Sequence, residues 1–362
     1  MNVLGIETSC DETAAAVVKD GREVVSSVVY TQIPLHQPYG GVVPEIASRA
    51  HIEKIGAVVG ETMTRFHGSG CGEVDAVAVT YGPGLSPALI VGLNAAKGLA
   101  KGLGVPLIGI NHIEAHLHTS FLIDHDDASA SDIPAPAECM PALGLAISGG
   151  HTAWIDMPEY GIYTILGQTL DDAAGEAFDK AAKLLGLGYP GGPVVDRIAK
   201  EFLSASGKDL ISFPKGRPRD GVSALAGLPA ELCVSFSGLK TALLRYVQRE
   251  GGAEALASAG EIPRVVASYQ EAIVQAIADR TRTALRRSRR RSLIVGGGVS
   301  LNSRLRSVLS DVAREAGVRL LLAKPRYCGD NGAMIAGLAF FRRNHEADAM
   351  RLDVNPCLEV GE

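Results

Sequence analysis

Apolar runs that end in glycine-rich or polar turns recur along the chain, and their order occurs twice. Short runs rich in Val, Ile and Ala predict strands, and longer stretches with apolar residues three and four apart predict helices. In the first half the pattern predicts strands over 3–8, 14–19, 23–30, 76–80 and 106–110 and helices over 44–66 and 87–103. In the second half it predicts strands over 142–147, 153–156, 163–168, 292–295 and 319–323 and helices over 172–185, 264–287 and 302–316. We therefore expect a duplicated α/β unit with a ligand-binding cleft between its copies.

Two polar segments interrupt this pattern and are predicted to be surface insertions. Residues 124–138 are rich in Asp, Ser, Ala and Pro, and residues 204–228 are rich in Ser, Gly, Lys, Arg and Pro. We expect a first subdomain over 1–120 and a second over 139–330, with a C-terminal helix over 331–345 that packs back on the first.

The composition is that of a soluble globular protein. Of 362 residues, 46% are hydrophobic and 21% are charged. The net charge of −5 means that any RNA-binding surface must be local. No apolar stretch is long enough to cross a membrane, and the first residues do not resemble a signal peptide. The six cysteines form no CxxC pair, so we expect reduced thiols and a cytoplasmic protein without a membrane partner.

The segment NHIEAH at 111–116 carries two histidines, His112 and His116, four residues apart. On a helix these positions share one face, so both imidazoles can reach one metal ion. Asp330 precedes a helix expected over 333–341 and is a good candidate for a third ligand. Because such a histidine pair alone is often incidental, its weight depends on the loops around it.

Histidine pairs on helices also occur in metallopeptidases, so that class has to be weighed. Zinc peptidases of the HExxH type place a catalytic Glu directly after the first histidine. Here Ile113 stands at that position, and Glu114 lies about 200° round the helix from His112, at about 100° per residue. A peptidase is therefore disfavoured.

Glycine-rich loops stand at matched places in the two halves. Residues 7–13 and 147–152 each join the first two strands of a half, where hydroxyls and backbone N–H groups can point at an anion. Residues 295–302 link a strand to a helix and suit a base or ribose, and the loop around Asp330 is the fourth. Each alone could be an ordinary turn, but together they favour nucleotide binding without a GxxxxGK[ST] phosphate loop. The arrangement resembles the fold of the actin, Hsp70 and sugar-kinase (ASKHA) superfamily, with two RNase H-like subdomains around a central cleft.

An acidic stripe is expected on the helix over 172–185, formed by Asp172, Glu176 and Asp179, with both lysines of this helix away from it. A solvated acidic face is the ordinary interpretation. A carboxylate that lines the cleft is about as well supported, because a glycine interrupts the helix and a Tyr-Pro-Gly-Gly-Pro turn follows it. Asp179 is the best candidate for this role, and Asp196 could serve the same pocket.

Basic residues gather at the end of the helix expected over 264–287. A solvated helix end that complements the helix dipole and a contact with RNA are about equally supported. The cluster consists of Arg282, Arg286, Arg287, Arg289, Arg290 and Arg291. Further basic candidates elsewhere are Lys215, Arg217, Arg219, Lys240 and Arg245.

Long motifs in order along nearly the whole chain resemble those of one family. In the first half they are GIETSCDET at 5–13, YGGVVPE at 39–45, GPGL at 82–85 and HIEAH at 112–116. In the second half they are SGGHT at 148–152, DDAAGEAFDK at 171–180, YPGGP at 189–193, SFSGLKT at 235–241, GGVSLN at 297–302 and DNGAMIA at 330–336. These motifs are similar to those of the TsaD (Gcp, YgjD, Kae) family of tRNA adenosine N(6)-threonylcarbamoyltransferases.

The resemblance implies an acyltransferase that modifies tRNA. Such an enzyme moves the threonylcarbamoyl group from threonylcarbamoyl-AMP to N(6) of the adenosine 3′-adjacent to the anticodon, in tRNAs that read codons beginning with adenine. It implies one divalent metal ion per subunit, usually iron, with zinc or magnesium as alternatives, bound by His112, His116 and Asp330. In bacteria the family works with TsaB, an inactive paralogue, and TsaE, an ATPase. The implied adenylate-binding residues are Ile147, Ser148, Gly149, Gly150, His151, Asp179, Gly192, Asp196 and Asn302.

The function and the general base stay open from sequence alone. An ATP-binding scaffold that assembles partners, without transferase activity of its own, is the alternative, and a complete metal triad weighs against it. The chemistry needs orientation of a weak amine and stabilisation of developing charge. Asp11 and Glu12 in the first loop are geometric candidates for the base. Trp154 and the two insertions depart from the family pattern, which affects the rim and partner surfaces rather than the centre.

Overall fold

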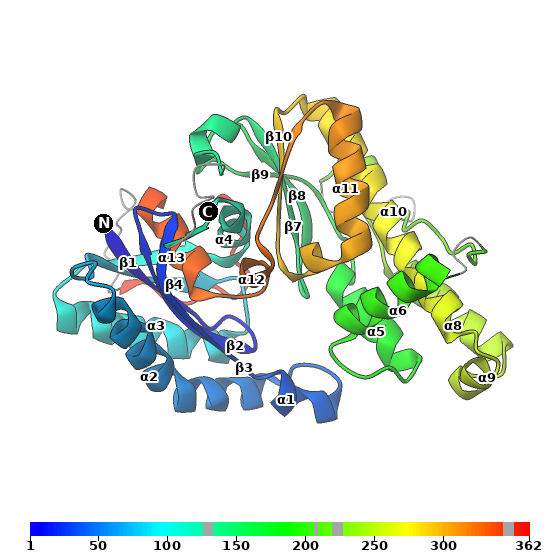
Figure 1. Ribbon diagram of the computed structural model, residues 1–362, viewed down its shortest axis with the longest axis horizontal. Coiled ribbons are helices and arrows are strands. Elements are labelled where there is room, and N and C mark those ends of the chain that lie inside the picture. The colour runs from blue at the N-terminus through cyan, green and yellow to red at the C-terminus, as the bar shows by residue number, and fades with distance from the viewer. Residues whose placement is uncertain (126–132, 206–208, 219–226, 343–350) are drawn as a thin grey trace. The chain divides into compact units, whose positions relative to one another are not determined.

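The structure is a computed structural model that describes residues 1–125, 133–205, 209–218, 227–342 and 351–362. Figure 1 traces the chain, which divides into two units. No helix among the described residues is long and apolar enough to span a membrane. The first unit holds Met1–Cys139, Glu159–Tyr163 and Ala323–Glu362, and the second holds Met140–Pro158 and Thr164–Leu322.

A six-stranded sheet forms the centre of the first unit. Its order is β5 (Leu107–Asn111), β4 (Ala76–Gly82), β1 (Asn2–Glu7), β2 (Glu12–Lys19), β3 (Glu23–Thr31) and β6 (Ile123–Asp124). Strand β1 is antiparallel to β2 and parallel to β4, and all of its residues are buried. Its last residue, Glu7, is therefore a buried carboxyl group at the end of an otherwise mostly apolar strand.

Helices cover both faces of this sheet. Because side chains alternate along a strand, Val3 belongs to a buried cluster with residues of α13, and Leu4 belongs to another with residues of α2 and α3. Figure 1 shows α13 on one face of the sheet and α2 and α3 on the other. A Cβ atom at Gly5 would stand 2.4 Å from backbone atoms of Gly332 and Ala336, so glycine is needed for the close approach of α13. The helices and 3₁₀ turns of this unit are α1 (Ile33–His36), η1 (Gln37–Tyr39), α2 (Pro44–Gly68), α3 (Ser86–Leu103), α4 (His112–His118), η2 (Thr119–Phe121), η4 (Pro136–Cys139), α12 (Pro325–Cys328) and α13 (Gly332–Arg342).

The second unit repeats the strand plan of the first. Its sheet has the order β11 (Arg319–Leu322), β10 (Ser292–Gly296), β7 (Ala142–Ile147), β8 (Thr152–Met157) and β9 (Thr164–Gln168). Strand β7 is antiparallel to β8 and parallel to β10, as β1 is to β2 and β4. Trp154 is fully buried in the core and donates its indole N–H to Thr281. The helices and 3₁₀ turns are α5 (Ala174–Leu184), α6 (Gly191–Ala205), η5 (Ala230–Leu232), α8 (Ser237–Arg249), α9 (Ala253–Ser258), α10 (Ile262–Ser288), η6 (Gly298–Leu301) and α11 (Ser303–Ala316).

The strands and helices predicted from the apolar pattern are present, with bounds that agree to within two residues. The division of the chain differs from the expected one, since the described residues of 121–139, together with 159–163 and 323–330, lie in the first unit. The reason is that β6 pairs with β3, and that Tyr327 of α12 is buried beside β6 with its hydroxyl on Asp124. Of the two expected insertions, 126–132, 206–208 and 219–226 lie outside the described residues. The expected cleft between the two halves stays a prediction.

Candidate metal centre and nucleotide loops

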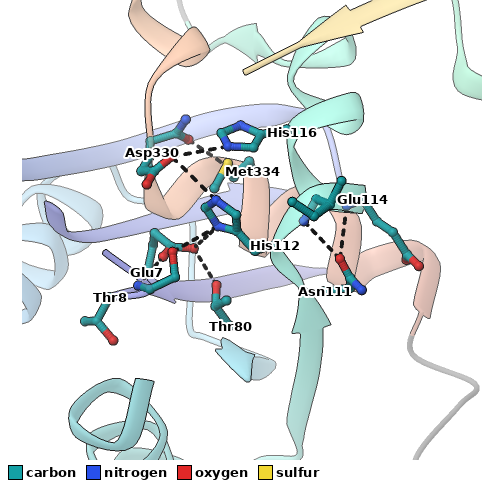
Figure 2. Close-up of polar contacts among 12 residues, drawn as sticks. Glu7, Thr8, Thr80, Asn111, His112, Glu114, His116, Asp330 and Met334 are labelled. Atoms are coloured by element: carbon teal, nitrogen blue, oxygen red, sulfur yellow. Dashed lines mark hydrogen bonds and ion pairs between the residues drawn. The ribbon is translucent and has the colours of Figure 1, made fainter. Parts of the chain in front are cut away.

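Asn111 starts the helix that carries the histidine pair. Its Oδ1 accepts from the backbone N–H of Ile113 at 2.9 Å and from that of Glu114 at 3.3 Å, so α4 begins directly after strand β5. His112 and His116 then lie one turn apart on one face of the helix, with ring centroids 4.6 Å apart (Figure 2).

Asp330 is brought to the histidine pair from the loop before α13. Its Oδ1 lies 3.2 Å from Nε2 of His116 and 3.7 Å from Nε2 of His112. One ligand atom from each of the three residues lies within 4.8 Å of the others. Two imidazole nitrogens and one carboxylate oxygen are a donor set that suits a divalent transition metal.

The surroundings of His116 support a metal at this place. The residue is 1% exposed, and neither of its ring nitrogens has a hydrogen bond among the described residues, although Nε2 lies at an ion-pair distance of 3.2 Å from Asp330. A buried polar atom normally has a partner, because leaving it without one costs free energy. A metal ion bound to Nε2 would provide that partner.

Glu7 orients His112 from behind. Its Oε2 lies 3.2 Å from Nδ1 of His112 and accepts from the hydroxyl of Thr80, while its Oε1 accepts from the backbone N–H of Ser9 (Figure 2). With Nδ1–H donating to Glu7, the Nε2 atom is left to face Asp330. Sequence reasoning missed Glu7, although a carboxyl group at the end of a strand of otherwise mostly apolar residues was a visible signal.

The two carboxyl groups decide the charge of His112. Burial would lower the pKa of this imidazole, but Asp330 and Glu7 outweigh burial and raise the pKa to about 9. Burial would likewise raise the pKa of Glu7, but His112 outweighs it and holds that pKa below its usual value. Without a metal ion, the geometry therefore favours an imidazolium between two carboxylates.

Glu114 lies on the other side of α4. Figure 2 shows its side chain pointing away from both imidazoles, and its carboxylate pairs with Arg342 and accepts from the backbone N–H of Gly361. The helix therefore directs no carboxylate base at the metal position, as a peptidase of the HExxH type would need. The peptidase alternative is not favoured.

Asp11 and Glu12 occupy the turn from β1 to β2. Asp11 is 9% exposed, and Glu12 opens β2 with its carboxyl accepting from the hydroxyl of Thr31. Burial, with repulsion from Asp330 and Asp11, raises the pKa of Glu12 well above its usual value. A carboxylate whose pKa is raised in this way is a stronger base than an ordinary carboxylate.

The hairpin loop of the second unit is open around its glycines. Ser148 and His151 close the turn through the bond from Ser148 N to His151 O at 2.8 Å. Gly149 and Gly150 are exposed, and no atom lies within 4 Å of a Cβ placed on either of them. Backbone groups at this turn can therefore be approached closely.

Gly175 does not interrupt the helix, contrary to the sequence-based prediction. It lies in the first turn of α5, where a Cβ would stand 2.7 Å from Cα of Gly149. Its N–H donates to Ser148 O, and the next N–H, that of Glu176, donates to Gly149 O. The glycine therefore lets the start of α5 pack directly against the hairpin loop.

Two of the remaining residues predicted to bind the adenylate are carboxylates that accept hydrogen bonds from the first residues of helices. Asp179 of α5 accepts from the N–H of Gly191 at 2.7 Å, next to Gly192 in the first turn of α6. Asp196 of α6 accepts from the N–H and hydroxyl of Ser303, the first residue of α11. Asp179 thus links α5 to the start of α6, and Asp196 links α6 to the start of α11.

Asn302 and the glycine loop complete this arrangement. Asn302 caps α11 through Leu305 N and donates to Gln270. Gly297 has φ of +99°, and a Cβ there would stand 2.3 Å from the backbone O of Ile147, so only glycine fits. The structure thus gathers the predicted nucleotide residues into one region of the second unit.

The acidic stripe predicted over 172–185 is wrong in part. Asp172 precedes α5 and binds Lys180 at 2.7 Å and Lys240 at 2.9 Å. Burial would raise the pKa of Asp172, but the two ammonium groups outweigh it and lower the pKa. Lys180 also pairs with Glu176, so it lies on the stripe rather than away from it.

Half of the arginine cluster is engaged in ion pairs. Arg290 holds Asp156 through two bonds of 2.6 Å, Arg287 pairs with Glu231, and Arg282 pairs with Glu315. Arg286, Arg289 and Arg291 are exposed. Lys240 is paired with Asp172, and Arg219 lies outside the described residues.

The fold and the two sites define a class of protein. Two units share one strand plan, the second has a hairpin loop and a glycine loop, and the first has a His-His-Asp cluster that could hold a metal ion. Together they indicate an ASKHA-type protein with a possible metal site. A solved structure of full-length HypF in the phosphate- and nucleotide-bound form matches with a TM-score of 0.55 at 12% identity, over 96% of this chain and 47% of that one. The structure of T. kodakarensis HypF matches with a TM-score of 0.57 at 15% identity, over 94% of this chain and 47% of that one. At these identities the likeness supports the fold alone, and it confirms the predicted fold class.

The family is established by sequence. The family model described as TsaD, tRNA N6-adenosine threonylcarbamoyltransferase, matches residues 23–337. A protein of that name from Anaeromyxobacter dehalogenans (strain 2CP-C) is 50% identical over 335 residues, 92% of each chain. Another, from Clostridium perfringens (strain SM101 / Type A), is 45% identical over 362 residues, 99% of this chain and 98% of that one. The chain belongs to the TsaD family, as its motifs predict.

Proposed function

We propose that this chain transfers the threonylcarbamoyl group from threonylcarbamoyl-AMP to N(6) of the adenosine 3′-adjacent to the anticodon, in tRNAs reading ANN codons. The observation that carries the proposal is the family match over residues 23–337. The donor is a mixed anhydride, so its carbonyl is already activated and AMP is a good leaving group. What the protein has to supply is orientation of the amine and stabilisation of charge.

The metal proposed for His112, His116 and Asp330 is Fe²⁺, one ion per subunit. Imidazole ligands also suit Zn²⁺, whereas Mg²⁺ prefers oxygen ligands and fits this donor set less well. When bound, the ion would supply Lewis-acid polarisation of the carbonyl or a hold on the phosphate. Glu7 fixes the tautomer of His112 so that Nε2 is the ligand atom.

The adenylate is proposed to lie on the second unit. The open hairpin loop, residues 147–151, can offer backbone N–H groups to the phosphate. Asp179 and Asp196 can accept from ribose hydroxyls, and Asn302 can offer its amide. Gly192, without a Cβ, leaves room at the start of α6, where no atom stands within 4 Å of the Cβ position.

Proton removal from the attacking amine is assigned to the first loop. Glu12 is the better of the two candidates, because its raised pKa makes it a stronger base than an ordinary carboxylate. Asp11 would then act on Glu12 by repulsion, keeping that pKa high.

The partners proposed are tRNA and, in a bacterium, the TsaB paralogue and the TsaE ATPase. An enzyme that modifies tRNA works where tRNA is used, so the proposed location is the cytoplasm. The alternative of an ATP-binding scaffold predicts no transfer by this chain under any combination of partners.

The test is reconstitution. The purified protein, loaded with Fe²⁺, is incubated with candidate partners, threonylcarbamoyl-AMP and unmodified tRNA, and the modified nucleoside is quantified after digestion. We expect product with the unaltered chain and at least about a hundredfold less with the double variant His112→Ala, His116→Ala. Equal product from both would place the catalytic centre elsewhere, and no product from either would favour the scaffold.

A further inference from the structure

Residues 351–362, called here the strap, lie against the first unit beside strands β4 and β5. Asn355 N donates to Tyr81 O at 2.8 Å, and Lys97 donates to Leu352 O at 2.6 Å. Leu358 is 6% exposed, and a Cβ at Gly82 would stand 2.0 Å from Asn355 O. The strap is therefore held by hydrogen bonds to β4 and to α3 and by the burial of Leu358.

The last residues of the strap bind the helix of the histidine pair. Asn111 Nδ2 donates to Glu359 O at 2.8 Å, and Gly361 N donates to Glu114 Oε1 at 2.9 Å. The residues that hold the strap are thus the N-cap of α4 and a residue of its first turn. They flank His112 in sequence, and Figure 2 shows both on the side of the helix away from the imidazoles.

Glu114 also joins α4 to the helix that follows Asp330. Its carboxylate pairs with Arg342, the last residue of α13, whose first residue stands two positions after Asp330. The two helices are in close contact, since a Cβ at Gly337 of α13 would stand 2.6 Å from the ring of His118. One carboxylate therefore connects the strap, the helix that carries both histidines and the helix that follows Asp330.

The burial of Glu114 makes these contacts matter. The residue is 1% exposed, and a buried carboxylate is unfavourable unless it is paired and hydrogen-bonded. Without the strap, Glu114 would keep Arg342 and lose the N–H of Gly361. Asn111 would at the same time lose the acceptor of its amide, while its cap of α4 could remain. Movement of α4 toward solvent would relieve both losses.

We infer that the strap clamps α4 in the position where His112 and His116 face Asp330, and that Asn111 and Glu114 are the positioning residues through which it acts. The inference rests on the proposed metal site. The strap supplies no ligand and acts on the site only through Asn111 and Glu114, whose contacts with it lie on the side of α4 away from the imidazoles.

The test compares the unaltered full chain with a chain that lacks residues 359–362, which keeps Leu352 and Leu358 in place. Co²⁺ serves as the probe, because its visible absorption reports both affinity and coordination geometry. We expect Co²⁺ affinity to fall about tenfold with an altered spectrum, the low end of effects seen for groups behind metal ligands. In the metal-free protein, backbone amides of α4 should exchange hydrogen at least about tenfold faster.

A second variant separates clamping from folding. Asn111→Ser keeps an oxygen that caps α4 but has no amide to donate to Glu359 O, so it should shift affinity and exchange in the same direction by a smaller factor. Cys357→Ser, at an exposed position of the strap, is the matched control and should change neither.

The outcomes distinguish the inference from the function it rests on. Unchanged Co²⁺ affinity or unchanged α4 exchange in the shortened chain would overturn the clamp while leaving the metal site intact. If the unaltered chain binds no Co²⁺, the metal site fails, and the exchange experiment on metal-free protein still decides whether the strap holds α4.

Discussion

A tight turn joins the first two strands of each unit, and the strand that leads into it ends in a different kind of residue in the two units. Strand β1 ends in Glu7, paired in register with Ala14, and β7 ends in Ile147, paired with Thr152. The carboxylate of Glu7 is buried against His112, whereas Ile147 presents its backbone to Gly297. One backbone plan therefore places a buried carboxylate beside a candidate metal site in the first unit and leaves an open backbone loop in the second.

Removing both histidines should abolish the metal centre and leave the second unit untouched. The double variant His112→Ala, His116→Ala loses two of three ligands, so metal affinity should fall by more than about a hundredfold. Metal analysis of the purified protein measures this, with exposed His67→Ala as control. Full occupancy of the double variant would show that the metal is bound elsewhere.

The metal-free first unit should lose stability as the pH rises. Burial alone would lower the pKa of His112, but Asp330 and Glu7 raise it from 6.5 to about 9, so the folded chain holds this proton more tightly than the unfolded chain. The contribution is complete below pH 6.5 and is lost between pH 6.5 and about 9, at most roughly 3 kcal/mol.

Urea unfolding of metal-free protein at several pH values measures this effect. The variant His112→Gln has no group to titrate here and should show a flatter pH dependence over the same window. The same slope in both proteins would mean that His112 carries no raised pKa.

Substitutions at Glu7 and at Ile147, the last residues of β1 and β7, test whether the side chain at this strand end supports the metal site. Glu7→Gln keeps the shape but weakens the hold on His112 Nδ1, so metal affinity should fall by about 10- to 100-fold. Ile147→Val at the equivalent place should cost roughly 0.5–1.5 kcal/mol of stability and leave metal affinity unchanged. Equal metal affinity in the Glu7→Gln variant and the unaltered chain would contradict the role of Glu7.

Filling the open loop of the second unit should block the nucleotide without disturbing the metal. Gly149→Val places a side chain where nothing now lies within 4 Å, so AMP affinity should fall at least about tenfold. Gly98→Val, at an exposed position of α3 in the first unit, is the control. Titration calorimetry measures the binding, and full affinity would place the phosphate elsewhere.

Two substitutions at Asn302 distinguish its role as the cap of α11 from its proposed role in nucleotide binding. Asn302→Ala loses the cap of α11 and about 1 kcal/mol of stability, whereas Asn302→Ser keeps a capping oxygen. Both should weaken AMP binding severalfold if the amide touches the nucleotide. Recovery of binding by serine would instead assign Asn302 to capping alone.

The smallest effect is expected from the exposed arginines of the second unit. Changing Arg286, Arg289 and Arg291 to Gln should weaken tRNA binding and flatten its salt dependence, by about 0.7–0.9 in the slope for each phosphate that an arginine no longer neutralises. Arg290→Gln breaks the pair with Asp156 and should cost stability without changing the slope. Filter binding across a salt series measures both, and an unchanged slope in the triple variant would leave the cluster a solvated helix end.

The secondary structure and the histidine pair of the candidate metal site could be predicted from local sequence patterns. The strand and helix bounds follow from apolar periodicity, and the histidine pair follows from two positions one helical turn apart. The prediction that Gly175 interrupts the helix is wrong, because a glycine in a helix often signals a break. Here the residue is glycine because a side chain would collide with Gly149, against which α5 packs. The sequence predicts that Asp172 belongs to an acidic stripe on the helix, whereas it precedes α5 and pairs with Lys240. Because Lys240 is distant in the chain, the local pattern does not indicate this pair.

The sequence by itself determined the local elements, the duplicated strand plan and the family motifs, since these depend on periodicity and on short segments. Only the tertiary structure decided that Glu7 holds His112, that Glu114 binds Arg342 and the strap, and that residues 323–330 return to the first unit. Each of these depends on packing between segments far apart in the chain. Whether a polar side chain is buried, and against which partner, is set by that packing rather than by its neighbours in sequence.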